Sequence, residues 1–475
     1  MDYLTCSILE IQQRPPFLVS YLCMTMGIMY TWPSSVLGLF SSSNTTLNRV
    51  MSETELSLLG SLSSISAVVT LPFSGYILDR LGRKYTCITF SLLQVSSWAI
   101  VIAFKTVEAV LTSIFISGVT SCTFIVIPLY VGEFCQESIR GSMASGVMMF
   151  FGIGMLISYL LGGLVQYEIM NYTCLTLTVI GVLLLCYVRE SPLMLMKKGF
   201  EKEAAKSLAH YRSVPVSSKE VQEEMNNIRR ILNPQLDENT PEEEKMRPDL
   251  NSVQKLSIWQ FFKKSRSSRR ALVVSLILNS AVVFQGLVVV QVYAQPLFEQ
   301  AIPSMSATVS SVIFAIVTVI AGFLAAYLVE ALGRKGLMIY SSILAAICCV
   351  ILGTQIQFTW GPHWVAALFI YLYCVVYTIG AGTIPYIYSA EVFLPEIKTF
   401  ASMLIMEWTF MCFFVVLFIF NPLVNCIGLG GVFYIFAVVC GLTSIFCVFF
   451  MPETKGLAVD AIQLKFATPR ARNTV

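Results

Sequence analysis

The chain has 475 residues, of which 56% are hydrophobic and only 12% are charged, and its mean hydropathy is +0.74. A soluble protein carries about twice that charged fraction, so the composition excludes an ordinary soluble domain and indicates a membrane protein. The net charge of +3 is small and gives no reason to expect a nucleic-acid partner.

Apolar runs long enough to cross a bilayer as a helix recur along the whole chain. The first run is too long for the core of a signal peptide, so we expect it to be a retained helix. The sequence therefore predicts an all-α membrane protein with twelve transmembrane helices. They cover about 17–40, 55–78, 85–104, 109–131, 142–166, 172–188, 271–297, 306–329, 336–357, 364–388, 400–422 and 428–450.

The first run contains Pro33 beside the polar residues Tyr30 and Thr31. A proline removes one backbone hydrogen bond, so the helix is expected either to break where it lines a cavity or simply to kink.

Positive charge is distributed unevenly over the links between these runs. Of the 31 Lys and Arg residues, only Arg49 and Lys105 fall in links assigned to the outer side. This asymmetry places both termini in the cytoplasm of a multi-pass cell-membrane protein. The sequons at Asn44 and Asn171 fall in outer links, so both asparagines are candidate glycosylation sites.

Charged landmarks repeat in the same order about 250 residues apart. Such a repeat predicts two six-helix halves, residues 1–188 and 271–450, as in alternating-access transporters. The landmarks are the turns at 79–84 and 330–335, the pairs Glu133/Arg140 and Glu391/Lys398, and the motifs that begin at Arg189 and Pro452.

The segment 189–270 is the one long hydrophilic stretch, and we interpret it as a cytoplasmic linker. Residues 200–211 predict a short amphipathic helix, residues 233–251 a flexible acidic segment, and residues 263–270 a basic anchor to anionic lipid. Residues 451–475 are expected to form a cytoplasmic tail.

Together these motifs resemble the sugar porter family of the major facilitator superfamily. The matching residues are Gly75 with 79–84, Pro128 to Glu133 with Arg140 and Gly141, Glu190-Ser191-Pro192, Glu330 with Gly333-Arg334-Lys335, Ile384-Pro385 with Glu391, and Pro452 to Gly456. Within the family, Tyr30, Thr31 and Pro33 are most similar to the facilitated trehalose transporters of insects.

The resemblance implies an ion-pair network that joins the two halves and closes a cytoplasmic gate. The alternative is a set of positive-inside charges without a gating role. The gate candidates are Asp79, Arg83, Lys84, Glu133, Arg140, Glu330, Arg334, Lys335, Glu391 and Lys398.

The seventh run departs from the family. Val282, Val283 and Val288 stand where sugar porters carry amide side chains that bind sugar hydroxyls. Gln285 and Gln291 each lie three residues further on, so a continuous helix would place them on the same face, displaced by about 4.5 Å. Either the polar row has moved toward the outer side, or the solute is not a typical hexose.

The remaining candidates for solute binding come from four other runs. Thr31 stands near the place of the aspartate that proton-coupled sugar porters carry, which favours facilitated transport. Glu407 is an acid inside a helix; it binds a polar solute or a proton in a cavity, or it is solvated near the inner interface. The full set is Thr31, Gln285, Gln291, Tyr293, Thr318, Tyr386, Glu407 and Trp408.

We therefore expect a facilitative transporter of a hexose or a trehalose-like sugar. The alternatives are a carrier of a non-sugar polar solute and a nutrient receptor that does not transport. A membrane enzyme is disfavoured, because the two histidines, His210 and His363, are far apart and no metal spacing or nucleophile arrangement is visible. No cofactor or metal is expected, the 14 cysteines are interpreted as buried free thiols, and the oligomeric state is left open.

Overall fold

The protein is all-α. The computed structural model describes residues 3–134, 137–212, 214–232, 265–457 and 459–467, and these contain no strand. In chain order the helices are α1 (Tyr3–Ser41), α2 (Glu53–Leu81), α3 (Arg83–Ala103), α4 (Val107–Val119), η1 (Thr120–Cys122), α5 (Thr123–Phe134), α6 (Glu137–Leu164), α7 (Tyr167–Tyr187), α8 (Pro192–Lys197), α9 (Glu201–Arg212), α10 (Lys219–Leu232), α13 (Arg266–Phe284), α14 (Leu287–Val292), α15 (Ala294–Ala301), α16 (Ala307–Leu332), α17 (Arg334–Phe358), α18 (His363–Ile379), α19 (Ile384–Val392), α20 (Pro395–Phe450) and α21 (Val459–Ala467).

Each of the twelve predicted apolar runs is helical. Within the described residues, eight helical segments are long and apolar enough to span a membrane, and Val107–Cys122 and Met149–Leu164 are shorter apolar helices. The eleventh and twelfth runs share α20, which turns sharply at Gly428, where φ is +75°. The seventh run is divided into α13, α14 and α15, and this division shapes the candidate site.

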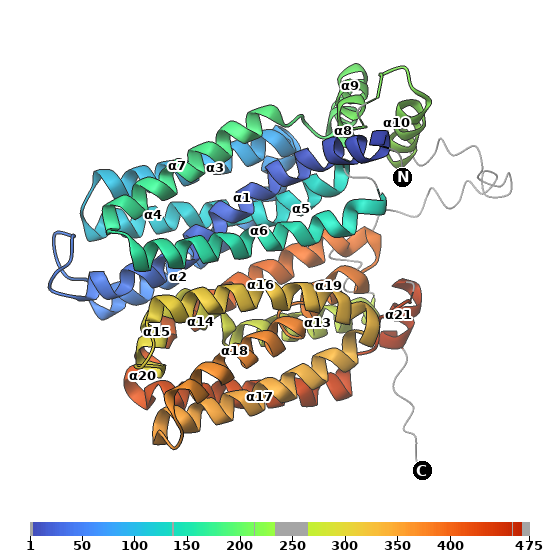
Figure 1. Ribbon diagram of the computed structural model, residues 1–475. Helices are drawn as coiled ribbons and strands as arrows, with labels where there is room; N and C mark the ends of the chain where they lie inside the picture. The colour runs from blue at the N-terminus through green and yellow to red at the C-terminus, as the bar shows by residue number, and fades with distance from the viewer. Residues whose placement is uncertain (1–2, 135–136, 213, 233–264, 458, 468–475) are drawn as a thin grey trace, which may run out of the picture.

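The helices form two groups that lie against each other (Figure 1). We call α1–α7 the first half and α13–α20 the second half. The start of α1, the linker helices α8–α10 and α21 all lie at the same end of the bundle. We call this end the terminal face and the opposite end the far face.

The largest apolar core is built mainly by the second half but includes Met155 and Tyr159 of the first half, and the first half has two further clusters. Tyr30 and Phe151 of the first half pack against the core of the second half. Met406 and Phe410 of the second half pack against a core cluster of the first. The linker helices have a separate small core around Leu208. The midplane between the halves is therefore lined largely by aromatic and methionine side chains.

Both ends of the described chain carry more helix than the sequence predicts. α1 begins at Tyr3 and continues through Pro33, so of the two alternatives expected at this proline the break is not formed. One lost backbone bond does not interrupt this helix, because its neighbour Trp32 is completely buried. The predicted tail contains α21, in which Ile462 and Phe466 are buried.

The linker carries more helix than the sequence indicates. α9 covers the helix predicted over 200–211, and α8 and α10 flank it. The predicted flexible segment 233–251 and the start of the basic stretch 263–270 lie outside the described residues.

Asn171 was predicted to lie in an outer link, but it lies in the second turn of α7. Its side chain is 2% exposed, and its Oδ1 accepts a hydrogen bond of 3.1 Å from Trp32 Nε1. The hydropathy pattern misses this because the first turns of α7 are polar. Asn44 is exposed between α1 and α2.

Candidate functional site

At the terminal face of the first half, a buried arginine–glutamate pair and a second glutamate that accepts from the start of the next helix form an arrangement that we call a clamp. The second half carries a matching clamp. Gly82 separates α2 from α3 with φ +98°, which places Arg83 in the first turn of α3. Its Nη2 lies 2.8 Å from Oε1 of Glu133, and the two side chains are only 10% and 6% exposed. Glu190 accepts hydrogen bonds of 3.0–3.2 Å from the backbone N–H groups of Arg83 and Lys84. A carboxylate at this position also stabilises the N-terminus of the helix.

The second half repeats this arrangement. Gly333 has φ +83°, and Arg334 Nη2 lies 2.8 Å from Glu391 Oε1. The carboxylate of Glu453 accepts from the backbone N–H groups of Arg334 at 3.0 Å and Lys335 at 2.9 Å. Burial alone would raise the pKa of Glu453, but its backbone donors outweigh that effect, so the pKa lies below its usual range.

Three other predicted gate residues bond within their own half or to the linker helix α8. Asp79 pairs with Lys197 at 2.8 Å, Lys84 Nζ donates to the Cys186 carbonyl, and Lys335 Nζ donates to the Val448 carbonyl. Among the ion pairs between side chains that the structure describes, none joins the first half to the second half. The predicted pairing across the halves is not formed by these residues in this conformation.

The structure describes the side chain of only one of the three remaining gate candidates. Lys398 is exposed. The side chains of Arg140 and Glu330 lie outside the described part of the structure.

The two halves are instead joined at the far face, by three hydrogen bonds between described residues. The Tyr159 hydroxyl donates to the Gln291 carbonyl at 2.6 Å. The backbone N–H of Gln295 donates to Ser34 Oγ at 2.9 Å. The third bond, at 3.5 Å, runs from Asn421 Nδ2 to Ser57 Oγ.

Tyr293 completes this contact. It is 1% exposed, its hydroxyl donates to the Leu417 carbonyl at 3.0 Å, and its ring stacks on Phe420. The hydroxyl lies directly against Gly60 of α2. Tyr293 therefore acts as a closing residue at the far face and does not point its hydroxyl into an open site.

The predicted polar row on the seventh run is wrong, because the helix is interrupted between Gln285 and Gln291. Gln285 ends α13 and is completely buried, with its Nε2 3.4 Å from Ser342 Oγ inside the second half. Gln291 belongs to α14 and is half-buried next to the first half. The two glutamines therefore do not share a face, and only Gln291 lies at the contact between the halves.

The predicted threonines are bonded within their helices. Thr31 is buried and donates to the Gly27 carbonyl at 2.9 Å. Thr318 donates to the Phe314 carbonyl at 2.8 Å and also lies 3.1 Å from Cys374 Sγ. Neither hydroxyl offers a free donor to a solute in this conformation.

The predicted pair in α20 lies away from the buried face of that helix. Trp408 is 47% exposed, and its Nε1 donates to Ser280 Oγ of α13 at 2.7 Å. Glu407 is half-buried. It precedes the buried Thr409 by two residues, and two residues correspond to about 200° around a helix, so Glu407 lies on nearly the opposite side.

Two tyrosines remain at the midplane with half-buried side chains. Tyr386 was predicted, whereas Tyr30 was noted only as a sequence marker; both pack against the core of the second half. Tyr159, which reaches across to Gln291, was missed because a single tyrosine in an apolar run carries no periodic signal. Glu190 and Glu453 were missed as clamp residues, although their place after the last helix of each half repeats in the sequence.

Two helical halves that close at one end, and that carry matching charged clamps at the other, have the architecture of a membrane carrier. The family model described as "Sugar (and other) transporter" matches residues 15–466. The chain therefore belongs to this sugar transporter family.

The relatives agree with the family. The facilitated trehalose transporter Tret1 of Bombyx mori is 26% identical over 470 residues, which cover 96% of this chain and 87% of the relative. The Tret1 of Apis mellifera ligustica is 25% identical over 427 residues, covering 88% and 80%.

Solved structures agree on the fold. The xylose transporter XylE from E. coli in an inward open conformation superposes with a TM-score of 0.75 at 19% identity, covering 96% of this chain and 99% of that one. XylE bound to 6-bromo-6-deoxy-D-glucose gives a TM-score of 0.69 at 19% identity, covering 98% and 100%.

Proposed function

We propose that this protein is a facilitative sugar transporter that works by alternating access, and that it is a carrier and not an enzyme. One observation supports this most: the halves are bonded to each other only at the far face among the described residues, while each clamp at the terminal face is complete within its own half. A rocking movement about the midplane would separate the far-face bonds without breaking either clamp.

The proposed orientation puts the terminal face in the cytoplasm of the cell membrane. The basic residues of the links gather at that face, as the positive-inside rule requires. In this orientation the described conformation faces inward, and the exposed Asn44 lies outside, where it is available to a glycan.

The solute we propose is a hexose or a trehalose-like sugar. The trehalose transporters among the relatives support the disaccharide. The polar groups available at the midplane are the hydroxyls of Tyr30 and Tyr386 and the side chain of Gln291, which are half-buried where the halves meet. Aromatic rings offer flat apolar faces together with one hydroxyl each.

A carrier of a non-sugar polar solute is the second candidate. It is favoured by Val282, Val283 and Val288, which are buried apolar residues where the resemblance leads one to expect amides. A site with fewer hydrogen-bond partners discriminates less strongly for a polyhydroxyl solute.

The experiment is uptake of labelled glucose, fructose, trehalose and a polyol into liposomes that hold the purified protein, with and without a proton gradient. Protein-free liposomes are the control. Saturable, gradient-independent uptake of one sugar is the expected result. Uptake that requires the gradient would contradict a facilitator, and bound solute without flux would identify a receptor.

A further inference from the structure

The division between α13 and α14 leaves backbone carbonyls without their helical donors, and two of them are those of Val282 and Gln285. Gly286 has φ +97°, a left-handed conformation that side chains disfavour. Its N–H bonds to the Val283 carbonyl at 3.1 Å, and the Val289 N–H bonds to the Gly286 carbonyl at 3.1 Å. In an unbroken helix these two N–H groups would bond to the carbonyls of Val282 and Gln285. Those two carbonyls are therefore released by the break.

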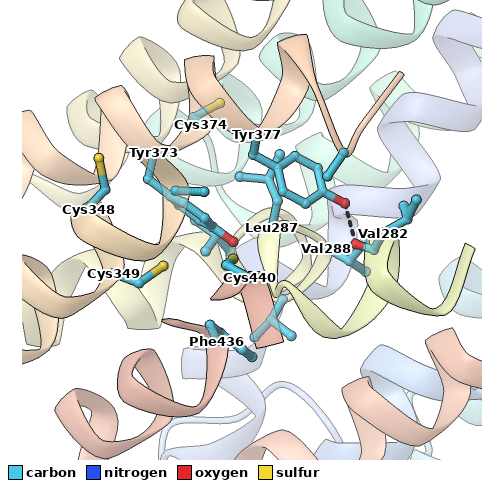
Figure 2. Close-up of a cluster of buried hydrophobic side chains, with 14 of the residues drawn as sticks. Val282, Leu287, Val288, Cys348, Cys349, Tyr373, Cys374, Tyr377, Phe436 and Cys440 are labelled. Atoms are coloured by element: carbon cyan, nitrogen blue, oxygen red, sulfur yellow. Dashed lines mark hydrogen bonds between the residues drawn. The ribbon is translucent and has the colours of Figure 1, made fainter. Parts of the chain in front are cut away.

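Two tyrosines of α18 take the place of the missing donors. The Tyr377 hydroxyl donates to the Val282 carbonyl, as the dashed line in Figure 2 shows. The Tyr373 hydroxyl donates to the Gln285 carbonyl. Residues four apart lie one above the other on a helix, so the spacing of the tyrosines matches the two released carbonyls. All four residues are at most 4% exposed, so neither water nor lipid reaches these bonds.

Of the two sides of the break, only the segment after it bonds to the first half among the described residues. Before it, α13 is tied to the second half, since Asn279 Nδ2 donates to Ser389 Oγ at 3.1 Å. After it, α14 and α15 bond to the first half through the carbonyl of Gln291 and the N–H of Gln295, and to the second half through the Tyr293 hydroxyl. Gly286 is therefore the point at which the far-face segment α14–α15 bends away from α13.

We propose that Tyr373 and Tyr377 are positioning residues that stabilise the broken form of this helix and thereby hold the far face closed. When the helix straightens, the carbonyls of Val282 and Gln285 regain their helical donors, and the tyrosine hydroxyls lose their acceptors. The tyrosine bonds thus differ between the two forms, and only such a difference shifts an equilibrium. The consequence for transport rests on the proposed function, but the conformational effect does not.

The test replaces each tyrosine singly by phenylalanine, which keeps the ring and removes only the hydroxyl. Tyr371→Phe is the matched control, because the Tyr371 hydroxyl of the same helix bonds to a carbonyl away from the break, that of Ser310, at 3.2 Å. Spin labels are placed on α15 and α2, at the exposed Glu299 and Thr54. Their distance is measured by pulsed electron paramagnetic resonance in nanodiscs without solute. The background carries serine at Cys6, Cys135, Cys186 and Cys426.

Tyr373→Phe and Tyr377→Phe should each increase the ratio of long to short distances about tenfold, the effect of one lost buried hydrogen bond. Tyr371→Phe should leave the distances unchanged. Unchanged distances in both Tyr373→Phe and Tyr377→Phe, or an equal change in the control Tyr371→Phe, would overturn the proposal. If one variant does not purify in folded form, the other decides.

Gly286→Ala provides an independent route to the same result. Its Cβ would lie 2.3 Å from the Phe436 ring and would be strained at the observed φ, so it should also favour long distances; a shift toward short distances would overturn the proposal. Because no solute is present, these distances remain decisive even if the uptake experiment refutes sugar transport.

Discussion

The buried pair Arg83–Glu133 should contribute more to stability than its counterpart Arg334–Glu391. The arginines are similarly buried, at 10% and 9% exposure, but Glu133 is 6% exposed and Glu391 is 27% exposed. Removing one partner of a buried pair costs about 3–5 kcal/mol, because the other charge is left desolvated. We therefore expect Glu133→Gln to cost about 3 kcal/mol and Glu391→Gln about 1 kcal/mol, since water reaches the second carboxylate and screens it.

The assay is the half-life of the folded protein at one elevated temperature, in one detergent, followed by tryptophan fluorescence. A rate is the appropriate measure because membrane proteins of this size unfold irreversibly. The double variant Arg83→Met/Glu133→Leu is the control, and it should recover much of the loss, because an apolar pair carries no unpaired charge. A half-life that is shorter for Glu391→Gln than for Glu133→Gln, or a double variant as unstable as the single one, would refute the reasoning.

Three further predictions follow from single side chains. The pKa of Glu453 lies below its ordinary value of 4.5. The stabilisation that the charged carboxylate provides is therefore complete above about pH 4.5 and is lost as the pH falls through the lower folded-state pKa. The difference in half-life between the unaltered protein and Glu453→Gln should shrink at low pH, and a constant difference would contradict this. Asn44→Gln should increase electrophoretic mobility by removal of a glycan, whereas Asn171→Gln should leave mobility unchanged but shorten the half-life, because the longer side chain displaces the amide oxygen that accepts from the buried Trp32. Gln291→Val should raise the KM for uptake severalfold, while Gln285→Val should leave it unchanged because Gln285 is buried inside the second half; a raised KM for Gln285→Val would show that it faces the solute.

The charged turns could be predicted from the sequence because their information is local. A glycine between a helix that ends and a helix that begins fixes the turn, and the next residue is an arginine in both halves. The structure places Gly82 and Gly333 in left-handed or similar positive-φ conformations, with Arg83 and Arg334 paired inside their halves. Glu133 and Glu391 were candidates because of the repeat, but their pairing with these arginines was not predicted, since the choice between pairing within a half and pairing across halves depends on the conformation.

The solute region could not be predicted in the same way, because its geometry depends on one backbone torsion. A glycine inside an apolar run is compatible with an unbroken helix, and an unbroken helix would align Gln285 with Gln291. The positive φ of Gly286 ends that alignment. The signal that accompanies the break is the pair Tyr373 and Tyr377 in a different run, and it becomes readable only when α18 is known to lie against α13.

The break also explains how this chain tolerates valines where the resemblance leads one to expect sugar-binding amides. Val282 and Val288 are 3% and 6% exposed and pack into the core of the second half, and the neighbouring Val283 is completely buried, so their loss of polarity costs nothing in folding. The missing polar groups instead lower the affinity for the solute. Three missing hydrogen bonds of about 1 kcal/mol each weaken a sugar site on the order of a hundredfold. We therefore expect a high KM, which suits a carrier that equilibrates an abundant solute and not one that collects a scarce one.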